Sequence, residues 1–160
     1  MRSPVSSFRQ NLTLRATPDA VFAALTTPRG LAGWWSDDCD VPTGPQNAVG
    51  ATVRVRFDCA KKDFRIERLE PGRALEWRCT AAYIDLPTLE RRSEWVGTRL
   101  RFDLASAPGG STELRFEHEG LEPTLECFEL CRAGWQQFLG SLQRFVETGR
   151  GEPYRLATQR

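Results

Sequence analysis

Residues 127–146 read CFELCRAGWQQFLGSLQRFV, and apolar side chains recur in this segment every three or four residues. They are Cys127, Phe128, Cys131, Trp135, Phe138, Leu139, Leu142, Phe145 and Val146. This spacing predicts one long amphipathic helix, from about Thr124 to Thr148. Gly149 is a natural residue to end it, and Pro153 cannot continue it. We therefore expect a loose tail over residues 150–160.

Upstream of this helix the apolar side chains alternate with polar ones, which is the period of a half-buried strand. The first such segment runs from Phe8 to Leu14, and the alternation returns in several later segments separated by turn signals such as Pro71-Gly72. These later segments are centred on residues 53–59, 64–66, 75–79, 96–104 and 112–118. The pattern predicts an antiparallel sheet of about six strands, in which His118 points inward.

Two short helices are expected between the first and second strands. Thr17-Pro18 and Thr27-Pro28 each combine an N-cap residue with a proline at the first helical position. The apolar face of the sheet needs a cover, and the C-terminal helix is the one element large enough to supply it. The sequence therefore predicts an α+β fold in which a curved sheet wraps around that helix and leaves a cavity between them.

Composition indicates a single domain. The chain has 160 residues with 22 Lys+Arg and 21 Asp+Glu, so its net charge of +1 provides no general field for nucleic acid. We expect one domain over residues 1–160, with a core at about 8–149 and loose ends at 1–7 and 150–160. The N-terminus lacks a secretory pattern and no stretch is apolar enough to enter a membrane, which favours the cytoplasm. The five cysteines are odd in number and widely spaced, which favours free thiols.

Several motifs resemble one known family. They are 17–28 (TPDAVFAALTTP), 33–35 (GWW), 97–104 (GTRLRFDL), 114–121 (LRFEHEGL) and 131–139 (CRAGWQQFL). The first two resemble START-like (SRPBCC) helix-grip domains, and the others resemble the branch named for the activator of the heat-shock-protein-90 ATPase. The resemblance covers about residues 8–154 and implies the helix-grip fold. Its members include lipid and polyketide binders, cyclases and chaperone activators, so it leaves the function open.

The interior is expected to be rich in aromatic rings, which stack on flat ligands. The residues we expect to line a ligand-binding space are Trp35, Phe57, Trp77, Phe102, Phe116, His118, Cys131, Trp135 and Phe138. The alternative is that these rings only pack against one another. Gly134 and Gly140 favour the cavity, because a glycine inside a helix costs about 1 kcal/mol and indicates either close approach or room for another group.

Other groups of residues do not lead to a catalytic, metal or cofactor site. His118 has no nucleophile with an orienting acid around it, so no catalytic residue is assigned. Cys127, Cys131 and His118 lack a fourth ligand, and the acidic segment 36–40 matches no calcium-loop spacing, so no metal site is assigned. There is no phosphate loop or dinucleotide motif, and no cofactor is implied.

Three functions remain open from the sequence. The first is binding of a hydrophobic, aromatic or lipid-like small molecule between the sheet and the C-terminal helix. The second is interaction with a chaperone or another protein through the charged outer face, which includes Arg99 and Arg101. The third is a cyclase or hydrolase with His118 as acid or base. We expect a binding protein rather than an enzyme, and the sequence leaves its oligomeric state unknown.

Overall fold

The computed structural model describes residues 7–156 and contains one antiparallel sheet of seven strands. The strands are β1 (Ser7–Leu14), β2 (Cys39–Asp40), β3 (Thr52–Phe57), β4 (Ala60–Glu70), β5 (Ala74–Ile84), β6 (Arg99–Ala107) and β7 (Ser111–Glu119). Their order across the sheet is β1-β7-β6-β5-β4-β3-β2. The helices are α1 (Pro18–Thr26), α2 (Pro28–Trp34) and α3 (Phe128–Thr148), with short 3-10 turns η1 (Gly44–Gln46) and η2 (Pro108–Gly110).

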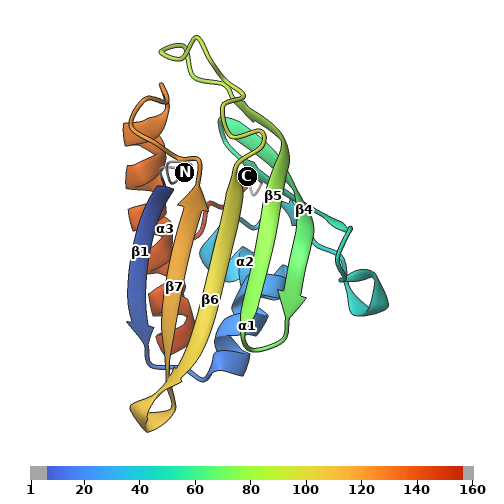
Figure 1. The fold of residues 1–160 in the computed structure, drawn as a ribbon, viewed down its shortest axis with the longest axis vertical. Coiled ribbons are helices and arrows are strands. Elements are labelled where there is room, and N and C mark those ends of the chain that lie inside the picture. Colours follow the sequence, from blue (N-terminus) through green and yellow to red (C-terminus); the bar gives the residue numbers. More distant parts are fainter. Residues whose placement is uncertain (1–6, 157–160) are drawn as a thin grey trace, which may run out of the picture.

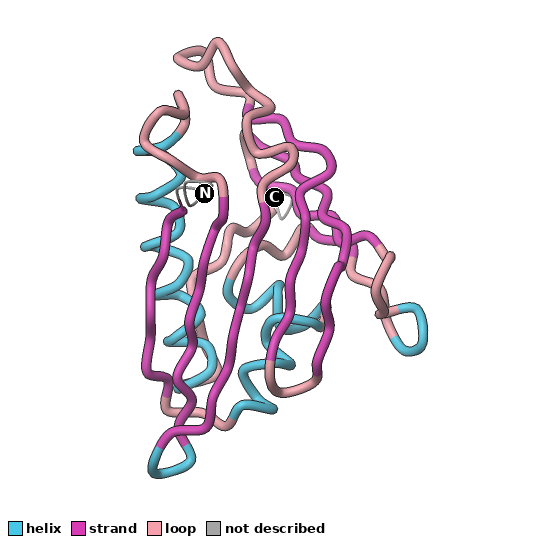
Figure 2. Tube along the Cα trace, in the orientation of Figure 1, coloured by secondary structure: helices cyan, strands magenta, loops and turns pink. Residues whose placement is uncertain are grey.

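The sheet and the helices form two layers. Figure 1 shows α1, α2 and α3 on the same side of the sheet, with α3 running along β1 and β7. Figure 2 shows the strands as a continuous layer in front of the helices. The register between β4 and β5 shifts at Asp63/Phe64 and again at Ile66/Arg68, and such bulges bend a strand. The predicted α+β helix-grip fold is confirmed, with seven strands instead of about six because β2 is too short to show a period.

Both short helices begin where the sequence indicates. The Thr17 hydroxyl accepts the N–H of Ala20 at 3.2 Å, and the Thr27 hydroxyl accepts the N–H of Gly30 at 2.9 Å. A Cβ on Gly30 would lie 2.5 Å from the carbonyl oxygen of Ala23, so only glycine lets α2 pack this closely on α1. The two helices are thereby fixed together across one end of the sheet.

The long helix α3 starts at Phe128, a few residues later than predicted. Its buried side chains include Cys131, Trp135, Leu139 and Leu142, which face the sheet with the periodicity seen in the sequence. It ends at Gly149, whose φ of 85° is the left-handed conformation that glycine adopts easily. The predicted helix and its end are confirmed.

The expectation of a loose tail is wrong for the part that the structure describes. Gly151 is buried, and the N–H of Glu152 donates to Ser141 Oγ at 2.6 Å. Tyr154 then pairs with the end of α2: its N–H donates to the carbonyl of Trp35 at 2.9 Å. These contacts join residues far apart in the chain, so no local periodicity in the sequence predicts them. Residues 1–6 and 157–160 lie outside the described residues.

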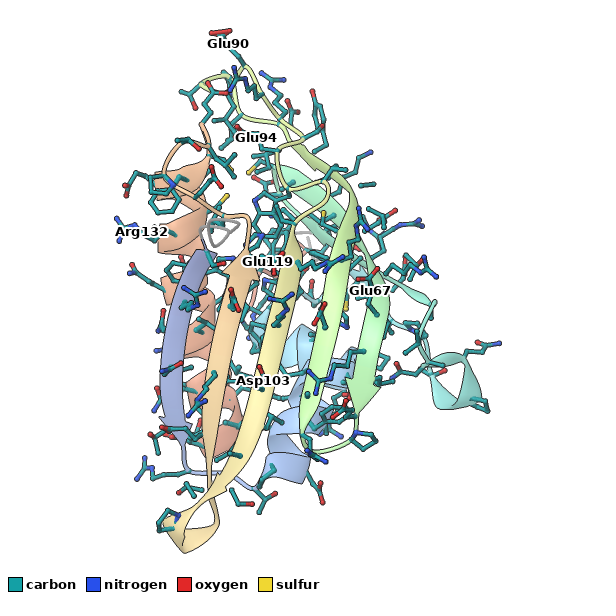
Figure 3. The ribbon with its side chains drawn as sticks, in the orientation of Figure 1. Glu67, Glu90, Glu94, Asp103, Glu119 and Arg132 are labelled. Carbon is teal, nitrogen blue, oxygen red and sulfur yellow. The ribbon has the colours of Figure 1, made fainter. Side chains whose placement is uncertain are left out.

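The outer face of the sheet carries interleaved charges, as the strand alternation predicts. Figure 3 shows Glu67, Asp103 and Glu119 on the side away from the helices. Arg101 contacts Glu76 at 3.0 Å and is also paired with Glu119. Exposed pairs of this kind contribute up to about 1 kcal/mol each, so the face is mainly a solvated surface. No helix within residues 7–156 is long and apolar enough to cross a membrane.

Candidate ligand-binding cavity

A cavity of about 370 Å³ lies between the sheet and the N-terminal half of α3. The β3–β4 hairpin, the end of β5, the loop over residues 85–98 and the C-terminal segment complete its wall. The wall is mostly apolar and contains six aromatic side chains, namely Trp35, Phe57, Trp95, Trp135, Phe138 and Tyr154. Apolar walls with a few polar groups are typical of small-molecule sites.

Five of the nine residues proposed from the sequence meet in this wall. They are Trp35, Phe57, Cys131, Trp135 and Phe138. The rings of Trp35 and Trp135 stack with centroids 5.6 Å apart, and Phe57 lies 5.6 Å from Phe138. Since these residues come from α2, β3 and α3, the fold has joined three distant segments into one aromatic surface.

The other four proposed residues do not line the cavity. Trp77, Phe102, Phe116 and His118 are buried in the packed layer beside it. The ring centroids of Phe102 and Phe116 lie 4.9 Å apart, and those of Phe102 and Trp77 lie 6.2 Å apart. Strand parity correctly places all four inside, but it does not tell how far along a strand the packed core gives way to open space.

The two adjacent tryptophans have different roles. Trp34 is fully buried and donates from Nε1 to the carbonyl of Ala24 at 2.8 Å, which ties α2 to α1. Trp35 stacks on Trp34 with centroids 5.4 Å apart and is one of the residues that line the cavity. The sequence analysis proposed Trp35 for the pocket, and of the two tryptophans Trp35 lies in the described wall.

Trp95 is a wall residue that the sequence analysis missed. It lies in the loop after β5, stacks on Trp135 at 6.0 Å and donates from Nε1 to Sγ of Cys131 at 3.1 Å. Because Trp95 belongs to no periodic segment, its position is set by tertiary contacts alone. The one sequence feature that could have indicated a role for Trp95 was the presence of a large aromatic residue in a long loop.

Two carboxylates fix this loop to the start of α3. Glu94 accepts the backbone N–H groups of Glu126 and Cys127, each at 3.1 Å. In return, Glu126 accepts the N–H of Arg91 at 2.7 Å and that of Glu90. Hydrogen bonds from these backbone groups lower the pKa of Glu126. Figure 3 shows Glu90 and Glu94 in the loop that extends beyond the sheet. Because Trp95 directly follows Glu94 and lines the cavity, these hydrogen bonds fix the part of the loop that carries Trp95.

Lys62 is another wall residue that the sequence analysis missed. It is only 8% exposed, and its Nζ lies 3.7 Å from the centroid of the Trp95 ring and 5.3 Å from that of Phe57. Burial lowers the pKa of this amine. The signal was present, because Lys62 has the same strand parity as Phe64 and Ile66, but the predicted strand began too late to include it.

His118 is hydrogen-bonded through both of its ring nitrogens. Trp135 donates from Nε1 to Nδ1 of His118 at 3.0 Å, and the opposite ring nitrogen, Nε2, lies 2.9 Å from Oγ1 of Thr98. Thr98 donates in turn to the carbonyl of Trp95 at 2.6 Å. These roles place the proton on Nε2, so both nitrogens are used. Burial, with the nearby charge of Lys62, lowers the pKa of His118 to about 3.

The two helix cysteines have opposite environments. A hydrogen bond from Cys127, the charge of Lys62 and the N–H of Trp95 lower the pKa of the Cys131 thiol, against the opposing effect of burial. The same hydrogen bond and burial raise the pKa of Cys127. Within residues 7–156 no three His, Cys, Asp or Glu side chains are grouped to hold a metal ion. Cys131 is thus a polarised thiol in the wall.

Comparison with known proteins identifies the family. The family model described as "Activator of Hsp90 ATPase homolog 1-like protein" matches residues 15–147. The chain belongs to this family. This result confirms the START-like resemblance drawn from the motifs, and no curated protein matches the chain.

Solved structures share the fold of this family member. The Aha1 dimer from Colwellia psychrerythraea is 28% identical, with a TM-score of 0.73 over 91% of this chain and 99% of that one. DynU16, a putative protein in the dynemicin biosynthetic locus, is 25% identical with a TM-score of 0.70 over 92% of this chain, which spans 49% of DynU16. A protein from Mesorhizobium loti, 23% identical, has a TM-score of 0.69 over 88% of this chain and 96% of that one.

Proposed function

We propose that this protein binds a hydrophobic, ring-containing small molecule in the cavity beside α3. The observation that carries the proposal is the open space behind Gly134. A Cβ at this position would meet no atom within 4 Å, although Gly134 lies in the interior of a helix and lines the cavity. Glycine is unfavourable inside a helix, so its presence here is explained by the room it leaves for another molecule.

The dimensions and chemistry of the cavity agree with such a ligand. Its volume of about 370 Å³ lies within the roughly 300–1,000 Å³ typical of small-molecule pockets. Trp35, Trp95 and Trp135 stack on one another in the wall and leave little surface exposed. The half-buried rings of Phe57, Phe138 and Tyr154, which also line the cavity, offer apolar surface to a ring system. The similarity to a protein of a biosynthetic locus also fits a domain that handles small organic molecules.

Binding is favoured over catalysis by the state of His118. Both of its nitrogens are occupied by Trp135 and Thr98, and it does not line the cavity. A general base must reach the proton that it removes, which this histidine does not do. The proposed activity requires no cofactor, and we expect it in the cytoplasm, where the free thiols would stay reduced.

Interaction with a protein partner is the second candidate, because the chain belongs to a family named for activation of a chaperone ATPase. In the structure Arg99 lies 3.6 Å from Glu67, and Arg101 is paired with Glu76 and Glu119. These arginines are therefore already neutralised within the sheet. If this face docks on a chaperone, reversing both arginines to Glu abolishes the complex while small-molecule binding is retained.

The test of small-molecule binding uses the neutral fluorophore N-phenyl-1-naphthylamine. We expect its fluorescence to rise on binding to the wild type and not to rise with Gly134→Leu, because leucine occupies the cavity. Gly140→Leu is the matched control, since Gly140 lies on the same helix, has no close neighbour except the end of Arg144 and does not line the cavity.

The controls distinguish loss of ligand binding from loss of the fold. Both variants replace a helix glycine and should keep the fold, which circular dichroism and thermal unfolding check. Native mass spectrometry of the gently purified protein adds a direct search for a molecule lost on denaturation. Absence of probe binding to the wild type, or equal binding by folded Gly134→Leu, would overturn the proposal.

A further inference from the structure

Lys62 is a buried amine at an apolar cavity. Its side chain is more than nine-tenths buried, it lines the cavity, and its Nζ lies over the face of Trp95. The charged side chains of the sheet behave differently: Arg54, Arg56 and Arg101 on the outer face each pair with a carboxylate. Within residues 7–156, no carboxylate lies within ion-pair distance of Lys62 and no hydrogen bond forms from its Nζ.

The ammonium group of Lys62 borders the open cavity and has no counter-charge among the described residues, so a bound anion could supply one. It carries three N–H donors, and burying a charge without a partner is costly. The ring of Trp95 attracts the cation but supplies no acceptor for its protons. The Cys131 thiol lines the same cavity and the charge of Lys62 lowers its pKa, yet its sulfur already accepts the N–H of Trp95.

We propose that the ligand of this cavity is an aromatic or otherwise hydrophobic acid, whose anionic group pairs with the ammonium of Lys62. The apolar part of the ligand then lies against the half-buried rings of Phe57 and Phe138 in the same wall. This inference rests on the proposed function, because it names the chemical class of the molecule that the cavity takes. Lys62 is the one basic side chain in the described wall, whereas Asp58 and Gln137, which also line the cavity, are exposed to solvent. Pairing with Lys62 would fix the orientation of the ligand.

Two fluorescent probes of nearly the same shape test the inference. 8-Anilino-1-naphthalenesulfonate carries a sulfonate that N-phenyl-1-naphthylamine lacks, so comparing their dissociation constants isolates the contribution of the anion. Lys62→Met removes the charge and retains the length of the side chain, whereas Lys62→Arg retains the charge. Lys61→Met is the matched control, because Lys61 is the neighbouring lysine and is exposed on the opposite face of β4.

We expect Lys62→Met to weaken binding of the sulfonate about 10- to 100-fold, the value of a hydrogen bond between charged groups. Binding of the neutral probe should change by less than about threefold, and Lys61→Met should affect neither probe. Lys62→Arg should recover part of the sulfonate affinity. Gly134→Leu should block both probes, which shows that they occupy the same cavity.

The two proposals fail in different ways. If neither probe binds the wild type in a manner sensitive to Gly134→Leu, the proposed function fails. If both probes bind the cavity but Lys62→Met weakens them equally or not at all, the proposed function stands and the anionic ligand is excluded. Removing a buried charge is expected to raise the thermal stability of the free protein, so loss of folding does not obscure the result.

Discussion

Between pH 6.5 and pH 4.5, acid should destabilise this protein chiefly through one side chain, His118. The chain has one histidine, and its ring is fully buried and neutral in the folded state. Its folded pKa is about 3, whereas the unfolded chain has the ordinary value of 6.5. The unfolded state therefore binds the proton first as the pH falls, so stability is full above pH 6.5 and is lost progressively below it.

The size of the effect follows from the two pKa values. At pH 4.5 the unfolded state holds almost one proton more than the folded state, and the stability lost between pH 7 and pH 4.5 is about 2.5 kcal/mol. Carboxylates with lowered pKa, such as Glu126 and Glu147, add their loss mainly below their ordinary pKa of 4.5. The window from pH 6.5 to 4.5 therefore reports chiefly on His118.

Urea denaturation at several pH values in this window measures the loss. His118→Gln is the matched variant, because its amide can accept from Trp135 and donate to Thr98 without titrating. We expect the free energy of unfolding of the wild type to fall steeply toward pH 4.5 and that of the variant to stay nearly level. If the two proteins show the same dependence on pH, the neutral, buried state assigned to His118 is wrong.

Three further substitutions test the packing around the cavity. Trp135→Ala should destabilise by about 3–5 kcal/mol, since it removes a buried ring from the core, and a nearly native free energy of unfolding in urea would contradict this. Glu94→Ala should lower the free energy of unfolding by about 0.5–2 kcal/mol, because it leaves two N–H groups at the start of α3 without their acceptor. An unchanged thermal midpoint would argue against the role of Glu94 in holding the loop to α3. Gly151→Ala should lower the free energy of unfolding by about 1–3 kcal/mol, because its Cβ would lie 2.6 Å from the carbonyl oxygen of Gly33. Gly140→Ala is the control and should be neutral or stabilising. Equal stability of the two variants would refute the docking of the C-terminal segment.

Much of the fold could be predicted from local patterns. The three- and four-residue spacing from Cys127 to Val146 predicted α3, and the paired Thr-Pro signals predicted α1 and α2. The alternation around His118 correctly placed this side chain inside the sheet. Each of these signals arises within one element, where the backbone period alone fixes which side chains share a face.

The candidate site was predictable only in part. Trp35, Phe57, Cys131, Trp135 and Phe138 follow from periodicity and lie in the cavity wall. The four remaining residues are equally periodic and equally apolar, yet they pack in the core beside it. Periodicity gives the face of an element, but the boundary between packed core and open space depends on how several elements meet.

The sequence by itself determined the element order, the inward face of each long strand and the grip of a curved sheet on one C-terminal helix. Three features depend on tertiary contacts. The loop after β5 places Trp95 on the cavity, Lys62 lies there with no described carboxylate within ion-pair distance, and the segment after α3 returns to Trp35. The reason is physical: burial of an apolar face is encoded within each segment by its period, whereas a cavity and its unpaired charge exist only between segments and depend on their three-dimensional contacts.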